Sequence, residues 1–211
     1  MSRTQLGGST DTIHIPGNLS VSGSKPAYAR SELSQESLAE YVIPFTALRK
    51  WNDFAALLPA TPLTDDLGIV TGTWATDSPS VQTEDLKAAG LTTSYFAFSF
   101  GIPPEYDSAN DILIRAHAGM LTTVSDTTAT IDFECFETDE KAGIGADLVT
   151  TAATTINSLT LADKDFVVTN SGIIPGDELI IRCAVAINDG ATGTAVKGII
   201  GKLSVLLDIR G

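Results

Sequence analysis

The two histidines, His14 and His117, are the first candidates for a catalytic role, because a Ser-His-Asp triad or a Cys-His dyad would need one of them. His14 lies in a stretch rich in Ser, Gly, Thr and Pro, where nothing holds a side chain in register. His117 lies beside Arg115 on the polar face of a predicted strand. No G-x-S-x-G, H-E-x-x-H or C-x-x-C motif accompanies either of them. We therefore predict no catalytic residue and a protein that is not an enzyme.

Adjacent carboxylates are the next candidates, and they occur at Asp65-Asp66, Asp139-Glu140 and Asp177-Glu178. Two carboxylates on the concave face of a sandwich would suit glycoside hydrolysis, and several carboxylate oxygens would suit calcium. Each pair falls where the sequence predicts a loop or turn, which favours a solvated surface. The chain also lacks a D-x-D-x-D-G loop, and we predict no metal and no cofactor.

Aromatic side chains could bind sugar by ring stacking, and most of the five candidates lie at strand ends or in the alternating core pattern. They are scattered along the chain, which favours packing in the core or at its rim. These residues are Tyr28, Tyr41, Trp51, Trp74 and Tyr106.

The two cysteines, Cys135 and Cys183, fall on the apolar faces of predicted strands. They are expected to be small buried side chains in a protein made in a reducing cytoplasm. Whether a disulfide joins them is left undecided, because the sequence does not give the distance and orientation of the two side chains.

The charge balance limits the possible partners. The 211 residues include 13 basic and 26 acidic side chains, which gives a formal net charge of −13. Such a chain repels phosphates, so nucleic acid is an unsuitable partner. The N-terminus has no apolar stretch of secretory length, and no apolar run is long enough to span a membrane.

Period-two alternation of apolar and polar residues organises most of the chain and predicts strands. About eight short strands separated by turn residues, with little helix between them, predict an all-β antiparallel sandwich or barrel. The clearest segments are Thr92–Ile102, Asp111–Leu121, Ile131–Cys135, Phe166–Val168, Leu179–Ile187 and Ile199–Ile209.

Less regular segments flank these strands. Tyr41–Phe45 is predicted as an edge strand, because Pro44 cannot donate to a ladder. Leu48–Leu58 is predicted as a short helix or a wide turn, and Leu67–Trp74 as a short strand. Asp147–Leu161 has no clear pattern and could contain a helical turn. Composition changes near residue 40, which predicts an N-terminal arm over 1–39 and a sandwich domain over 40–211. Such an arm buries too little apolar surface to fold by itself, so it is either disordered or ordered against another surface.

Several motifs carry a resemblance to a known family and cover about four-fifths of the chain. The stretch from Ile43 to Gly211 resembles phage structural proteins that are encoded near the major capsid protein. The matching motifs are Ile43–Asp53 (IPFTALRKWND), Asp66–Gly72 (DLGIVTG), Val81–Lys87 (VQTEDLK), Phe98–Tyr106 (FSFGIPPEY), Thr122–Thr130 (TTVSDTTAT), Leu159–Phe166 (LTLADKDF) and Leu206–Arg210 (LLDIR).

This resemblance implies a jelly-roll-like sandwich that decorates or cements a tailed-phage capsid, commonly as a homotrimer. The expected partner is the major capsid protein, and the expected location is the capsid surface after synthesis in the host cytoplasm. The arm would bind the shell or a neighbouring protomer, gaining backbone hydrogen bonds by adding a strand to another sheet. The candidate interface residues are Ile13, His14, Ile15, Tyr28 and Arg30. The alternative is a head-fibre or tail-associated module that contacts a host glycan.

Overall fold

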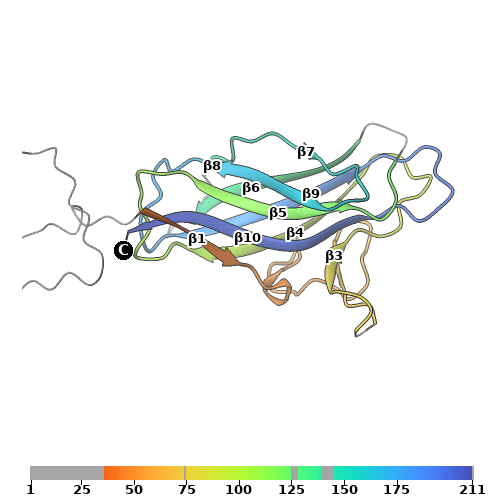
Figure 1. The fold of residues 1–211 in the computed structure, drawn as a ribbon, viewed down its shortest axis with the longest axis horizontal. Helices are drawn as coiled ribbons and strands as arrows, with labels where there is room; N and C mark the ends of the chain where they lie inside the picture. Colours follow the sequence, from red (N-terminus) through yellow and green to blue (C-terminus); the bar gives the residue numbers. More distant parts are fainter. Residues whose placement is uncertain (1–35, 74, 125–127, 139–144, 211) are drawn as a thin grey trace, which may run out of the picture. The chain divides into compact units, whose positions relative to one another are not determined.

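Two antiparallel sheets pack face to face and form a sandwich (Figure 1). The structure is a computed structural model that describes residues 36–73, 75–124, 128–138 and 145–210. These residues contain ten strands and no α-helix. The strands are β1 (Glu36–Val42), β2 (Gly68–Val70), β3 (Ser80–Gln82), β4 (Thr92–Gly101), β5 (Ile112–Met120), β6 (Ala129–Thr138), β7 (Thr154–Thr155), β8 (Ala162–Val168), β9 (Glu178–Ile187) and β10 (Gly198–Arg210).

The strand order is that of a jelly roll. Sheet A has the order β2-β3-β10-β5-β8, with β1 also paired to β10, and sheet B has the order β4-β9-β6-β7. Strand β10 is long enough to pair with β3 through Ile199 and Ile200 and with β1 from Ser204 onward. Without the short β2 and β3, the sheets are β1-β10-β5-β8 and β4-β9-β6-β7, an eight-stranded jelly roll. The predicted fold class is confirmed, with two short strands added to it.

Alternating apolar side chains from both sheets form the core between them, as the period-two patterns predicted. Phe166 of sheet A meets Phe133 of sheet B, with ring centroids 4.9 Å apart. Phe133 in turn lies edge-on to Phe96 at 6.3 Å. These rings are at most 1% exposed, so they fix the spacing of the two sheets at the centre of the sandwich.

The less regular segments differ in part from expectation. Leu48–Leu58 forms a wide turn, in which Lys50 N–H donates to Ala56 O and Leu58 N–H donates to Leu48 O, so the helix alternative is wrong. No helical turn forms within 147–161, where β7 is the regular element. The predicted strand Leu67–Trp74 shortens to β2, and β3 was not predicted.

The start of the sandwich also differs from expectation. Strand β1 begins at Glu36, so the expected boundary at residue 40 falls inside a strand. The strand ends at Val42, and Pro44 precedes a single 3-10 turn over Phe45–Ala47. Residues 1–35 lie outside the described part of the chain. Within that part, no helix is long and apolar enough to cross a membrane.

Candidate interaction surface

The five residues predicted to form an interface lie outside the described residues. The structure therefore neither brings them together nor separates them. They are Ile13, His14, Ile15, Tyr28 and Arg30. A site can instead be built from the edges and outer faces of the sandwich.

The outer edge of β8 is covered by the chain itself at its C-terminal end, around Val167. Thr150 N–H donates to Val167 O at 2.9 Å, and Val167 N–H donates to the Thr151 hydroxyl at 2.9 Å. Leu148 joins this segment to the opposite sheet, because its N–H donates to Cys135 O. Covering this part of the edge prevents it from pairing with another chain.

The outer edge of β4 is covered over only part of its length. Arg49 and Ala97 exchange two backbone hydrogen bonds of 2.8 and 2.9 Å, and Tyr95 bonds to Asp65 and Leu67. The residues before Arg49 form the 3-10 turn Phe45–Ala47, so they do not continue this pairing as a strand. The edge of β4 beyond Ala97 therefore has no backbone partner among the described residues.

Alternation along β4 shows which groups this open edge presents. Ile102 N–H donates to Asp177 O, so even-numbered residues of β4 bond toward β9 and odd-numbered ones point outward. Ser99 and Gly101 consequently direct their N–H and C=O groups to the open edge. We call this stretch, Ser99–Gly101, the open β4 edge.

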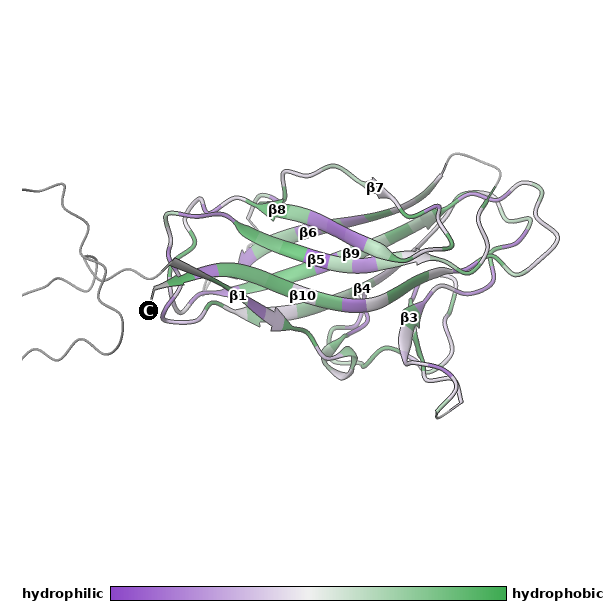
Figure 2. Ribbon diagram, viewed as in Figure 1, coloured by the Kyte–Doolittle hydropathy of each residue, from purple (hydrophilic) through white to green (hydrophobic). Residues whose placement is uncertain are grey.

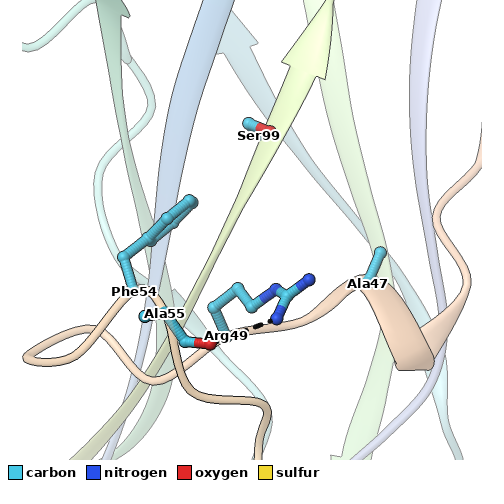
Figure 3. Close-up of a pocket in the computed structure, with 5 residues that line it drawn as sticks. All are labelled: Ala47, Arg49, Phe54, Ala55 and Ser99. Atoms are coloured by element: carbon cyan, nitrogen blue, oxygen red, sulfur yellow. Dashed lines mark hydrogen bonds between the residues drawn. The ribbon is translucent and has the colours of Figure 1, made fainter.

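A hollow of about 410 Å³ adjoins the open β4 edge. Ala47, Arg49, Phe54, Ala55 and Ser99 line it, and in Figure 3 Phe54 and Arg49 lie on opposite sides of the strand that carries Ser99. Arg49 Nη1 donates to Ala55 O over a long 3.4 Å and forms no ion pair with any described residue. Phe54 is 38% exposed. The hollow therefore combines one cation with apolar surface.

The edge of β1 is also open. Ile43 N–H bonds Leu203 O, so by alternation Leu38, Glu40 and Val42 direct their backbone groups away from β10. No described residue bonds to these groups from the outer side. Leu38 and Val42 are 59% and 58% exposed, which places apolar side chains beside unpaired backbone. Such an edge favours pairing with another chain.

The outer face of sheet A carries a ladder of ion pairs. Arg115 binds Asp165 through two hydrogen bonds, and His117 Nδ1 lies 2.7 Å from Asp163. Lys202 binds Glu40 at 2.6 Å, and this hydrogen bond lowers the pKa of Glu40. In Figure 2, hydrophilic residues colour parts of β5, β8 and β10, the strands of sheet A that carry most of these pairs. His117 lies on the polar face, as predicted, and its charged neighbours are structural partners.

An arginine between two aromatic rings marks the outer face of sheet B. The Arg182 guanidinium lies 4.4 Å from the centroid of Trp51 and 5.3 Å from that of Tyr95, and it forms an ion pair with Glu134. Burial raises the pKa of the neighbouring Asp132, and the charge of Glu134 adds to this effect. The cluster anchors the wide turn that carries Trp51 onto the sheet.

The remaining chemical candidates are packed into the fold. Asp66 is buried and pairs with Lys50 at 2.7 Å. Tyr106 is buried, and its hydroxyl donates to Asn110 O at 2.6 Å. Tyr41 lies edge-on to Phe100, with centroids 5.7 Å apart. Packing at the core or its rim is therefore confirmed for these two tyrosines, whereas Tyr28 and Trp74 lie outside the described residues.

Cys135 and Cys183 are buried free thiols, as predicted, and form no disulfide with each other. Burial raises the pKa of Cys135 to about 12, with a smaller contribution from Asp147, and burial raises the pKa of Cys183 as well. Among the described residues, no group of three or more His, Cys, Asp or Glu side chains is arranged to hold a metal ion.

Sequence reasoning missed Arg49 and Arg182, the two arginines around which these surfaces are built. Arg49 lies outside any regular alternation, and the alternation of Leu179–Ile187 places Arg182 on a polar face without indicating its partners, which are far away in the sequence. The presence of Arg49 and Trp51 in the motif Ile43–Asp53 was the one available signal.

Comparisons with known proteins add little to this geometry. No protein-family model and no curated protein matches the chain. Among solved structures, the chain is similar to the CBM22-1 xylan-binding domain of Xyn10C from Paenibacillus barcinonensis, with a TM-score of 0.39. The identity is 11%, and the match covers 69% of this chain and 82% of that domain. This likeness carries no inference about function.

Proposed function

We propose that this chain is a non-enzymatic structural protein that decorates and stabilises a tailed-phage capsid. It binds between subunits of the major capsid protein on the capsid surface, as a homotrimer. Two findings support this role. The motifs from Ile43 to Gly211 resemble phage structural proteins, and the jelly-roll sandwich is the fold that this resemblance implies.

The open edges of β1 and β4 are the observation on which the role depends most. Exposed strand edges promote uncontrolled association, and proteins cover or blunt them unless the edges serve in assembly. The chain covers the edge of β8 at Val167, whereas the edges of β1 and β4 have no backbone partner among the described residues over Leu38–Val42 and Ser99–Gly101. Docking to a shell or to a neighbouring protomer would cover them.

The N-terminal arm would add a second point of attachment. Ile13, His14, Ile15, Tyr28 and Arg30 are its candidate contacts with the shell or with a neighbour. A protein that bridges several subunits through linked contacts gains avidity beyond each single contact, which suits a capsid under internal pressure.

Cryo-electron microscopy of purified particles tests this role through copy number and position. We expect density for the sandwich in clusters of three across the shell, in numbers that approach those of the capsid protein. A few copies at the tail or at a single vertex would contradict the capsid role.

The alternative role is a head-fibre or tail-associated module that contacts a host glycan. Trp51 and Tyr95 favour it, because two half-buried aromatic rings lie on one outer face of the sandwich. Arg182 covers one face of the Trp51 ring, so that face is not free to stack on a sugar. A glycan array separates the two roles: binding that is lost in Tyr95→Ala would favour the alternative.

A further inference from the structure

We infer that the hollow beside the open β4 edge binds an extended peptide segment of a partner protein that carries a carboxylate. The segment would add one strand to sheet B beside Ser99 and Gly101, and its carboxylate would bind Arg49. The partner need not be a capsid protein, so failure of the capsid role leaves this site unaffected.

The backbone provides the first reason. On the side of β4 away from β9, backbone groups of Asp65, Leu67 and Arg49 bond to Tyr95 and Ala97. No described residue bonds to Ser99 and Gly101 on that side. The vacant position continues the line of Arg49, whose backbone already pairs with Ala97. An extended chain supplies the alternating donors and acceptors that these groups require, whereas a helix satisfies its own.

The charge of the hollow provides the second reason. Arg49 is the one charged residue among the five that line it, and its guanidinium forms no ion pair with a described residue. This is notable in a chain of net charge −13, where acidic side chains outnumber basic ones twofold. A planar guanidinium binds a carboxylate through two parallel hydrogen bonds.

The other lining residues and the volume of the hollow indicate the polarity and size of the rest of the peptide segment. Ala47, Ala55 and the exposed ring of Phe54 offer apolar contact to a neighbouring side chain of the segment. A volume of about 410 Å³ lies in the range of small-ligand sites and fits a few side chains. A polyanion such as nucleic acid is disfavoured by the overall charge of the protein. One carboxylate within an otherwise neutral strand avoids most of this repulsion.

The test uses the full chain, labelled with nitrogen-15, and a set of capped seven-residue peptides of alternating Thr and Val. A single Glu is placed at each position in turn, and the matched peptides carry Gln. We expect amide shifts at Ser99 and Gly101 with at least one Glu peptide. We also expect roughly tenfold weaker binding when the matched Gln peptide replaces the Glu peptide, and when the Glu peptide is added to the Arg49→Gln variant. Equal affinity of the Glu and Gln peptides, or shifts at other residues, would overturn the inference.

Two further variants separate the strand from the charge. Ser99→Pro removes an N–H that faces the open edge and keeps the bonds to β9, so it should block the peptide without unfolding the sheet. Lys87→Gln removes a cation at another place and should leave binding unchanged. Unaltered binding by Ser99→Pro, with its melting temperature retained, would refute strand addition. The same shifts with acetate alone would mean that the hollow binds small anions and not a strand.

Discussion

Arg115 of β5 binds Asp165 of β8 through two parallel hydrogen bonds, from Nε at 2.6 Å and from Nη2 at 2.7 Å. The pair stands directly opposite across the two strands, and Asp163 adds a weaker contact at 3.8 Å. The hydrogen bond from Arg115 lowers the pKa of Asp165 from its usual 3.8. Opposite charges facing each other in this way favour the observed register of the two strands.

The pair predicts a pH-dependent contribution to stability. Because the folded-state pKa of Asp165 is lower than the unfolded one, the pair stabilises the fold above pH 3.8 and loses this effect as the pH falls through the folded value. The side chain is 39% exposed, so Asp165→Asn should cost at most ~1 kcal/mol at neutral pH. Urea unfolding across the acid range measures this. Asp53→Asn, at an exposed aspartate with no ion pair to a described residue, is the control, and a pH-independent loss would contradict the assignment.

Gly198 should tolerate no side chain. A Cβ there would lie 2.9 Å from Val185 Cγ1, inside the core between the sheets. Gly198→Ala should therefore destabilise the protein by about 1–3 kcal/mol through overpacking. Gly101→Ala is the matched control, because a Cβ at Gly101, the last residue of β4, would meet nothing within 4 Å. Chemical denaturation of both variants gives the comparison, and equal stability would show that the core opens at Gly198.

The contact between Phe133 and Phe166 should contribute strongly to the stability that the packing of the two sheets provides. Phe166→Ala removes a fully buried ring and is expected to cost about 3–5 kcal/mol. Phe54→Ala removes a ring that is 38% exposed and should cost about 0.5 kcal/mol or less. Calorimetry of the two variants tests this difference, and similar losses would contradict the described core.

Both thiols should be unreactive in the folded protein. The raised pKa of Cys135, about 12, leaves almost no thiolate at neutral pH, and Cys183 is fully buried on the neighbouring strand β9. Iodoacetamide should label neither cysteine until denaturant is added, and should then label both. Mass spectrometry reads the result. Rapid labelling of the folded chain, or a mass lower by two hydrogens, would contradict two buried free thiols.

The sandwich could be predicted because its long strands are buried on one face and alternate over most of their length. Phe96, Phe98 and Phe100 point inward from β4, and Ile181, Cys183 and Val185 do the same from β9. The signal fails for short elements. Strand β3 has three residues, too few for a period to appear, and the wide turn around Trp51 is held by contacts with the sheet that sequence spacing does not encode.

The interaction surfaces could be predicted much less well. The open β4 edge exists because Arg49 pairs with Ala97, a residue 48 positions away, at a single bridge. The alternation of β4 continues unchanged through Ser99 and Gly101, so no sequence pattern marks the place where the pairing stops. The residues chosen from sequence, Ile13 to Arg30, lie outside the described chain and stay a prediction.

The position of β10 has a consequence for how the chain acquires its fold. This strand pairs with β1, β3 and β5, all of which precede it, and its contact with β1 joins residues as distant as Glu36 and Arg210. During synthesis those earlier strands emerge with no neighbour at the centre of sheet A. Proteins dominated by such long-range pairing fold slowly, in milliseconds to seconds. Their nascent strands are exposed to aggregation in the meantime, so a chaperone that holds the growing chain should raise the soluble yield.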